Sequence, residues 1–599
     1  MKLDKILILW IFFITHSINL CSQSSFYSEY GKNRIQYKSV KWSIIYSNNF
    51  EVYYNNNEKD LADLTSKYLE NNFREMTSLV GHQPIKKTKV FIFNSPSELI
   101  QSNIGINNKD LFLSTNLAQN NSIQFEIAFS NTKEIFKQKL KYKFLKVIIN
   151  DLMRGNNGFS DRFGKASFSS IPIWFIDGAS RYLAYGWDLK MDDVIRDYFL
   201  TKDLKKIKNI TDKNPEIIGQ SIWNYISIYY GKNIISNILN LTKIIRNPEK
   251  AIASSLGKSF NEVMEEWQNY YLLSINSYNE QYSKLNDNYL INFKKKYSNI
   301  TDLKISPNNE NILFSSKNKN GITLSILEKN TNKINTISKV INTSKNNNFY
   351  STWINDDKIG YLKMINGINN IIIYDIINRQ KTYKPIPNFK NVNGFSFNYT
   401  TNLIALSGTI NSNNNLYLLS TYKNSIKQLT NDISDDIQPK FFPKSNSIVF
   451  SSNRTHNKID SVIYKVLSYN NLFIYSLDTT KNYLHQITKT ISDDINALPI
   501  SRNEIIYMSD LKGINTLYKY DISNNTFKQV TDYYSNILNY DYNIKEKSLA
   551  LSILKGGKIK TYDIKNYNVE KTIFTPKTSR TIYYDKQKIS EIKVEKKDL

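Results

Sequence analysis

The chain is 599 residues long, carries a formal net charge of +26 at pH 7 and contains one cysteine. This length is enough for two or three domains, each with its own core. Lysine is spread evenly along the chain beside heavy use of Asn and Ile, without the basic stripe and recognisable module of a nucleic-acid-binding protein. The composition therefore argues against nucleic acid as a partner and indicates a solvated basic surface.

Residues 1–22 have the pattern of a secretory signal peptide. Lys2 and Lys5 precede the apolar run at 6–14, and small polar residues lie before Gln23. The apolar run is too short to cross a bilayer as a helix, and no later run is as long. We therefore expect an exported chain without a transmembrane helix.

The only cysteine, Cys21, lies at the end of this segment. Cleavage after Ser22 would leave a mature chain without a thiol, which must depend on core packing for its stability. The alternative is a lipoprotein acylated at Cys21, although Leu20 precedes it where a small residue is preferred. We favour cleavage after Ser22.

Residues 23–275 have the patterns of an α+β domain. From about 140 onward helices dominate, and Gly231 and Gly257 lie where helices should end. The first half is expected to contain two strands around an Asn-Asn turn at 42–54, an amphipathic helix at 58–80, a buried strand at 88–93 and a helix opened by Ser95-Pro96.

A linker is expected at 276–300, and strands with turn residues then recur with a period of about 40 to 50 residues. The repeated units begin near 301, 346, 392, 434, 492 and 533. This period is typical of a β-propeller, so we predict six four-stranded blades over 301–575. Residues 576–599 are expected to form a closing strand or a tail. Equivalent tyrosines mark five of the units: Tyr374, Tyr417, Tyr475, Tyr520 and Tyr562.

The repeats resemble the TolB-like propeller. The phrase "PKFFPKSNSIVFSSNR", which starts at Pro439, is similar to the family phrase P-x-F-S-P-D-G-x-x-I-x-F-S-S-N-R. The resemblance implies loops and a central channel that are offered to protein partners, without catalysis.

The first domain resembles the peptidase MA-like (gluzincin) domain of bacterial envelope proteins. The resemblance rests on "WSIIYSNNFEVYY", on "IPIWFIDGASRYLAY" (from Ile171) and on "GQSIWNYISIYYG" (from Gly219) with the later "EEWQNYY". In an active member an HExxH helix and a Glu on the next helix bind zinc. Together, the two resemblances imply a multidomain fold, in which a gluzincin-like α+β domain is followed by a six-bladed β-propeller.

The residues at the implied zinc positions are poor metal ligands. The matching five are Asn150, Asp151, Leu152, Met153 and Arg154, so both His are replaced and the general base is an Asp. Asn binds zinc weakly, and a guanidinium does not lose its proton to bind a metal. We therefore expect no metal, no cofactor and no peptidase activity.

The next helix carries two further changes. Asp177 is at the position of the third ligand, and Arg181 replaces a second family Glu. An ion pair between Arg154 and Asp177 is expected to replace the metal, because a guanidinium can satisfy a carboxylate through two hydrogen bonds. The alternative is that Arg154 points to solvent. Asn150 and Arg154 are four residues apart and share one helix face, which Asp177 should approach.

The four histidines offer no replacement ligand set. His16 is in the signal peptide, His456 and His485 are in the propeller, and His82 lies on a loop far along the sequence from the site. The sequence has no G-x-S-x-G elbow and no P-loop.

Two pairs of adjacent carboxylates, Asp192-Asp193 and Asp435-Asp436, also invite a catalytic interpretation. Adjacent side chains on a helix or strand point apart, so neither pair is expected to act on one substrate. We therefore predict solvated turns at both places.

These observations favour a non-catalytic envelope protein that acts as a scaffold or adaptor in outer-membrane assembly or maintenance. Its expected partners are envelope or outer-membrane proteins, and its expected location is the periplasm or the outer membrane. Two alternatives stay open at this point: a residual metal-dependent hydrolase that uses Asp151 or Asp177, and a module that binds glycan or peptidoglycan.

Overall fold

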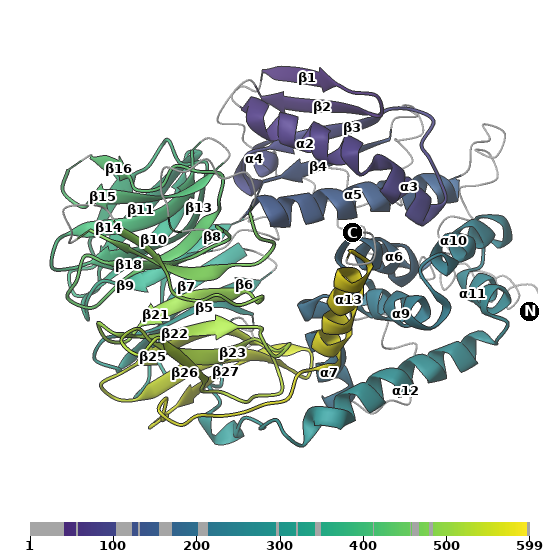
Figure 1. The fold of residues 1–599 in the computed structure, drawn as a ribbon. Helices are drawn as coiled ribbons and strands as arrows, with labels where there is room; N and C mark the ends of the chain where they lie inside the picture. Colours follow the sequence, from purple (N-terminus) through teal and green to yellow (C-terminus); the bar gives the residue numbers. More distant parts are fainter. Residues whose placement is uncertain are drawn as a thin grey trace, which may run out of the picture.

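The structure is a computed structural model of the chain. It describes residues 41–55, 58–102, 123–129, 132–154, 171–201, 214–294, 297, 299–318, 321–341, 349–410, 413–423, 425–455, 457, 466–477 and 483–595. The expected signal peptide, Cys21, His16 and His456 lie outside these residues. Figure 1 shows the described chain as a helix-rich part beside a ring of sheets.

The first domain begins with a four-stranded sheet in the order β1-β2-β3-β4. The first pair is antiparallel and the other pairs are parallel. Phe50 and Val52 alternate with more exposed residues and are fully buried, as the sequence predicted. The strands are β1 (Trp42–Tyr46), β2 (Phe50–Asn55), β3 (Thr88–Phe93) and β4 (Gln124–Ala128).

The helix expected at 58–80 is two helices, α2 (Lys59–Asn71) and α3 (Phe73–Val80). Asn72 interrupts it, because its side-chain amide donates to the Tyr68 carbonyl oxygen at 2.7 Å and competes with the helical pattern. The next helix, α4 (Pro96–Gln101), starts as predicted, with the Ser95 hydroxyl accepting from the Glu98 N–H.

The helical half of the domain contains seven further labelled helices. Gly231 and Gly257 end α9 and α11, respectively, as the sequence predicted. The helices are α5 (Lys133–Arg154), α6 (Ile173–Tyr185), α7 (Leu189–Thr201), α9 (Pro215–Tyr230), α10 (Ile234–Ile245), α11 (Pro248–Leu256) and α12 (Phe260–Asn279). Among the described residues, no helix is long and apolar enough to cross a membrane.

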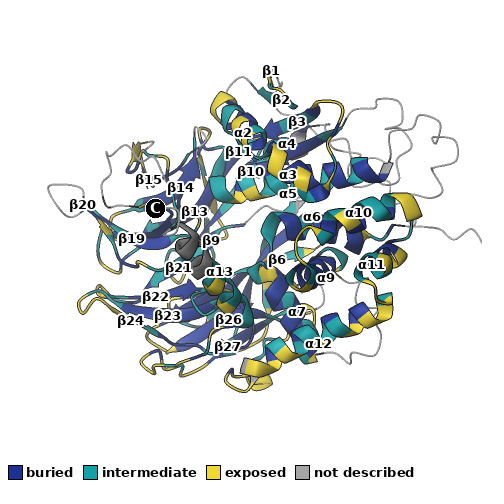
Figure 2. Cartoon of the chain, turned by 45° about the vertical axis from the view of Figure 1, so that its right-hand side comes forward, coloured by how far each residue is buried: buried dark blue, intermediate teal, exposed yellow. Residues whose placement is uncertain are grey.

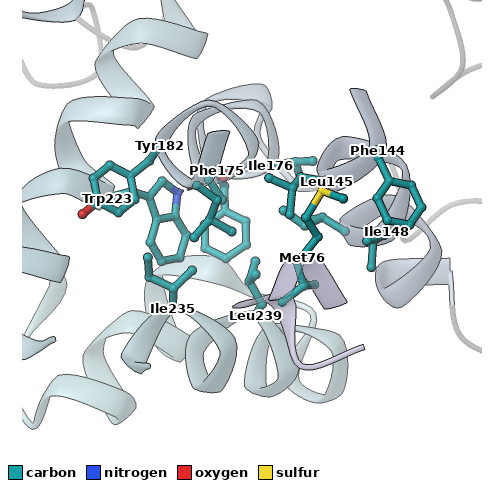
Figure 3. Packing of buried hydrophobic residues seen from close by; sticks show 14 of the residues in the cluster. Met76, Phe144, Leu145, Ile148, Phe175, Ile176, Tyr182, Trp223, Ile235 and Leu239 are labelled. Atoms are coloured by element: carbon teal, nitrogen blue, oxygen red, sulfur yellow. Dashed lines mark hydrogen bonds between the residues drawn. The ribbon is translucent and has the colours of Figure 1, made fainter. Parts of the chain in front are cut away.

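The core of this domain is centred on α6 and α9, which Figure 2 shows as mostly buried. The two helices approach very closely, since a Cβ atom added at Gly219 would lie 1.9 Å from the Trp174 carbonyl oxygen. The Trp223 indole N–H donates to the Phe175 carbonyl oxygen at 2.9 Å and ties the helices together. Figure 3 shows Phe175, Tyr182 and Trp223 in the apolar packing around this contact.

Four residues of α6 were predicted to build this core, and all four are buried. Trp174 is 7% exposed, Phe175 is 0%, Tyr182 is 6% and Leu183 is 9%. The apolar surface of the motif is therefore accounted for by packing alone.

The second domain is a six-bladed β-propeller, as the repeats predicted. Five blades have four antiparallel strands in chain order, and each of the five equivalent tyrosines lies on the third strand of its blade. The first two blades are β5 (Ile300–Ile305), β6 (Asn311–Asn318), β7 (Gly321–Glu328), β8 (Ile334–Ile341), and β9 (Ser351–Trp353), β10 (Lys358–Ile365), β11 (Ile368–Asp375), β12 (Lys381–Pro385).

The third and fourth blades are β13 (Asn391–Asn398), β14 (Leu403–Thr409), β15 (Asn414–Ser420), β16 (Ile426–Gln428), and β17 (Asp436–Phe441), β18 (Ile448–Ser452), β19 (Asn471–Ser476), β20 (Tyr483–Gln486). The last two are β21 (Asp494–Pro499), β22 (Glu504–Ser509), β23 (Thr516–Asp521), β24 (Thr526–Gln529), and β25 (Ile537–Asn543), β26 (Ser548–Lys555), β27 (Lys558–Ile564).

The sixth blade differs from the prediction, because its own strands number three. The expected linker supplies the missing contact: Leu290 forms an antiparallel bridge with Tyr562, and the Ile291 N–H donates to the Thr561 carbonyl oxygen at 2.9 Å. The segment before the propeller therefore covers the outer edge of its last blade. This pairing satisfies part of an edge that would otherwise stay open.

The end of the chain also differs from the prediction. Residues expected to form a closing strand or a tail instead form a helix, α13 (Ser579–Glu595), which follows the last blade. The linker before the first blade contains a short helix of its own, η7 (Asp287–Tyr289). The closing strand is unnecessary because the linker already pairs with β27. Figure 1 shows α13 returning to the helices of the first domain.

Candidate functional site

The predicted peptidase-like site lies where α5 faces α6. The Lys146 amino group contacts the Asp177 carboxylate at 2.8 Å, which makes lysine the observed counter-ion of the predicted third ligand. Lys146 is four residues before Asn150, so Asp177 meets the helix face on which the sequence placed it. The Arg154 side chain is not among those described, and its pairing with Asp177 stays a prediction.

The environment of Asp177 is poorly hydrated. Burial raises the pKa of its carboxyl group above the ordinary range, while the neighbouring Lys146 ammonium acts in the opposite direction. Glu216 raises this pKa further and Arg181 lowers it. The carboxylate is therefore held by one lysine against the cost of burial, and the balance disfavours its charged form.

Arg181 does not face a metal position. Its Nε atom donates to the Gln220 side-chain oxygen at 2.9 Å, and its guanidinium contacts the Asp188 carboxylate at 3.3 Å. The guanidinium also lies over the Tyr185 ring, 5.1 Å from the centroid. These contacts connect α6 to α9 and to the segment before α7, which is a structural arrangement.

Asp151, which was predicted to replace a general base, has a partner that the sequence did not indicate. The His82 imidazole Nε2 lies 2.8 Å from the Asp151 carboxylate, although 69 residues separate the two. His82 was not expected at this site because of that separation. The αL conformation of Gly81, which ends α3, is the local signal for the sharp turn that returns the histidine to α5.

The donor set does not fit a catalytic zinc ion. Among the described residues, no three His, Cys, Asp or Glu side chains form a group that could hold a metal. Asp177 is paired with Lys146 and Asp151 with His82, and the Asn150 amide oxygen is buried without a hydrogen-bond partner in the part of the chain that the structure describes. One neutral amide oxygen is far short of the three strong ligands that zinc catalysis needs.

The carboxylates predicted to be solvated are instead all buried, and one of each pair binds across the contact between the domains. On α7, Asp192 is held by Arg196 and accepts from the Trp187 indole N–H at 2.9 Å, within its own domain. Asp193 accepts from the Asn536 N–H of the propeller, also at 2.9 Å. Asp193 also lies 3.6 Å from the Arg196 guanidinium, so the two adjacent carboxylates share one cation and both point into protein rather than into water.

The same helix makes two further contacts with the propeller. The Asp197 carboxylate accepts from the Gly556 and Gly557 N–H groups, each at 2.7 Å. The buried Arg196 guanidinium donates to the Tyr534 carbonyl oxygen at 2.9 Å. Asp193 and Asp197 are four residues apart, so one face of α7 carries the carboxylates that bind the sixth blade and the loop before it.

The second carboxylate pair connects the other end of the contact. Asp435 accepts from the Lys133 N–H at the start of α5 at 2.8 Å, so the propeller caps this helix of the first domain. Asp436 binds the buried Arg454 guanidinium within the fourth blade, through two hydrogen bonds of 2.6 Å. The prediction of a solvated turn is wrong here for the same reason as on α7.

The C-terminal helix α13 contacts both domains. Its Tyr584 hydroxyl accepts from the Trp187 N–H at 3.0 Å, and its Ser579 hydroxyl donates to the Ser274 carbonyl oxygen at 3.2 Å. Arg580 pairs with Asp510 in the fifth blade at 3.4 Å. The helix therefore bridges the first domain and the propeller.

No family model and no curated protein matches the sequence. Among solved structures, the chain is similar to TolB from Acinetobacter baumannii, with 12% identity and a TM-score of 0.32 over 47% of this chain and 66% of that chain. It is also similar to a putative TolB from Agrobacterium tumefaciens, with 13% identity and a TM-score of 0.32 over 45% of this chain and 90% of that one.

A third likeness is to the β-propeller domain of the Trilobed protease from Pyrococcus furiosus. The identity is 11% and the TM-score 0.30, over 46% of this chain and 98% of that one. The assignment of the propeller rests on the six sheets described above.

Proposed function

We propose that the protein is a non-catalytic, exported scaffold that presents partners with a propeller held at a fixed angle to a peptidase-like domain. The observation that carries the proposal is the contact between the domains. Carboxylates on α7 and in the fourth blade bind backbone N–H groups across it, and α13 bridges it again. Such a contact keeps two binding surfaces in one geometry, which is what a scaffold requires.

The proposed loss of peptidase activity is supported by the chemistry at α5 and α6. Lys146 forms an ion pair with Asp177, the carboxylate that would be the third zinc ligand. His82 pairs with Asp151, the carboxylate that would be the general base. The proposed partners are envelope or outer-membrane proteins, as the resemblance to TolB-like propellers and the expected signal peptide imply. The role in outer-membrane assembly is part of the same proposal.

The chemical half of the proposal is tested by metal analysis and a peptide-cleavage assay on the purified mature chain. We expect no stoichiometric zinc and no cleavage of a peptide library. About one zinc per chain, with activity that a chelator removes, would overturn this half and favour the residual hydrolase.

The partner half is tested by affinity capture from an envelope fraction of the source cells, followed by mass spectrometry. We expect envelope proteins to be recovered equally by the wild type and by an Asp177→Asn variant, because the proposed scaffold does not use that carboxylate. Recovery of glycan fragments alone would contradict the scaffold and favour a carbohydrate-binding module.

A further inference from the structure

The contacts with the first domain all lie at one end of the propeller. They reach loops between blades and turns between second and third strands, such as those at Asn536, Gly556 and Asp435. The turns that join first to second and third to fourth strands lie at the opposite end, because adjacent strands of a blade are antiparallel. We call this opposite end the turn face.

Two lysines on innermost strands lie toward the turn face. Lys304 is the residue before the last of β5, and Lys440 is the residue before the last of β17. Each is partly exposed to solvent, although the strands that carry them are the first strands of blades one and four. The first strands of a propeller surround its central axis, so the exposure of both side chains places solvent along this part of the axis.

Of the two, Lys440 is the one without a counter-ion. Its ammonium group has no hydrogen bond or ion pair with any residue in the described parts of the chain, whereas the Lys304 ammonium contacts the Asp302 carboxylate at 3.5 Å. Burial and the neighbouring Lys304 lower the pKa of Lys440 to about 8, against the attraction of Asp541 and Asp302. An ammonium group in such a place gains from an added anion.

The two aspartates near these lysines are already used. Asp302 accepts from the Ser351 N–H at 3.1 Å and from the Ser351 hydroxyl at 2.8 Å. Asp541 accepts from the Ile305 N–H at 2.7 Å. Both carboxylates tie neighbouring blades together, so their positions are set by the ring and not by Lys440.

Toward the first domain, the innermost strands of the middle blades come into close contact. A Cβ atom added at Gly394 would lie 2.9 Å from the Gln438 Cα atom. The Gln438 side-chain oxygen in turn accepts from the Asn496 N–H at 2.9 Å. Lys440 lies on the turn-face side of these contacts, so we expect a ligand to reach it from that face.

The turn face around this position carries an exposed cation on each of blades three to six, together with the exposed carboxylates Glu546 and Glu570. Exposed cations lie in the turns of each of these blades, and Tyr399 and Tyr422 are exposed beside them at 62% and 82%. The exposed cations of these turns are Lys423, Lys444, Arg502 and Lys545. Aromatic and arginine side chains, such as the two tyrosines and Arg502, are enriched in protein interfaces.

We propose that the turn face binds an acidic polypeptide segment, one carboxylate of which reaches the axis and pairs with Lys440. The inference rests on the proposed scaffold function and adds the chemistry of the partner. Charge complementarity selects the occupant, since the exposed cations attract an acidic chain and the axial lysine requires one anionic group. An ammonium group binds such a carboxylate as a point charge, with charge-assisted hydrogen bonds.

The test uses fluorescence anisotropy of a labelled hexa-aspartate peptide with the full mature chain at low salt. Lys440→Met keeps the length of the side chain and removes its charge. Lys86→Met, in an exposed loop of the first domain, makes the same change in net charge elsewhere. We expect the Kd of the Lys440→Met variant to rise about tenfold, and that of the Lys86→Met variant to stay within about twofold.

Wild-type binding should also weaken as the pH rises from about 7 to about 9, while the residual binding of Lys440→Met stays flat. Equal Kd values for Lys440→Met and the wild type, or no wild-type binding, would overturn the inference. Equal affinity for acetate would overturn the polypeptide part of it. The melting temperature of Lys440→Met should equal or exceed that of the wild type, which excludes misfolding as the cause of lost binding.

The envelope capture described above separates this inference from the scaffold proposal. If the wild type captures partners and Lys440→Met captures them equally, the scaffold stands and the axial site is overturned. If Lys440→Met loses the partners that Lys86→Met retains, the capture supports both.

Discussion

Buried carboxylates are found in two regions of this molecule, and they are satisfied in different ways. At the α5–α6 contact, Asp177 is held by a single lysine that is itself 29% exposed. At the contact between the domains, Asp193 and Asp197 accept from backbone N–H groups of the propeller. Backbone donors are fixed by the fold, whereas a lysine ammonium is mobile and readily hydrated. The carboxylates of the domain contact are therefore the ones that determine the arrangement of the molecule.

The largest expected effect belongs to the packing beneath the first region. Trp174→Ala should lower the free energy of unfolding by about 3–5 kcal/mol, because the indole ring is almost completely buried between α6 and its neighbours. Urea denaturation measures this change. Leu273→Ala, at a side chain that is 72% exposed, is the control and should stay within about 0.5 kcal/mol of the wild type. A small effect at Trp174 would contradict the packing account.

The next largest effect is expected at the domain contact. Asp197→Ala removes two hydrogen bonds to a carboxylate, each worth about 1.5–3 kcal/mol, and should lower the free energy of unfolding by about 3 kcal/mol. Limited proteolysis should also become faster in the segment between α12 and β5. Asp63→Ala on α2 is the matched control, and cleavage at an unchanged rate in Asp197→Ala would weaken the comparison.

A smaller effect concerns pH. Burial raises the pKa of Asp193 to about 7, although Arg196 and the Asn536 N–H both favour its charged form. An unfolded chain titrates this group near pH 3.9, so the folded chain retains the proton between about pH 4 and 7. The stability from that proton is complete below about pH 4 and is lost as the pH rises through about 7.

Asp193→Asn should therefore show a smaller fall in melting temperature between pH 5 and pH 8 than the wild type. The amide oxygen still accepts from Asn536, so the contact itself is kept. Melting curves at several pH values measure the difference, and parallel curves for the two proteins would show that Asp193 does not titrate in this range.

The smallest effect is expected for Asp177→Asn, within about 1 kcal/mol at pH 7. Burial already disfavours the charged carboxylate, and Lys146 is exposed enough to regain water when its partner is neutral. Asp436→Asn makes the same substitution beside the fully buried Arg454 and should cost about 3 kcal/mol, as expected for a broken buried pair. Equal losses in both variants would remove the distinction between the two regions.

The repeats and amphipathic patterns were sufficient to predict most of the fold. The period of the strands and the tyrosines on third strands gave six blades, and the apolar residues of α6 gave its buried face. The closure of the ring was not predictable, because it depends on a single bridge between Leu290 and Tyr562. The helix at the C-terminus was missed because a strand was expected where the linker already pairs.

The contacts of the candidate site were harder to predict than its position. Spacing placed Asp177 beside the α5 face, but the choice of Lys146 as counter-ion depends on side-chain reach. The His82–Asp151 pair joins residues that only the tertiary fold brings together. The carboxylate pairs of α7 and the fourth blade were predicted to be solvated from their local sequence alone. Local sequence does not indicate that distant parts of the chain cover them.

Differential scanning calorimetry of the wild-type mature chain near pH 7 tests the central claim most directly. If carboxylates across the contact join the two domains into one body, unfolding should be a single transition whose calorimetric and van't Hoff enthalpies agree. The Asp197→Ala variant should then show two resolved transitions. Two independent transitions in the wild type, unchanged in the variant, would contradict the claim.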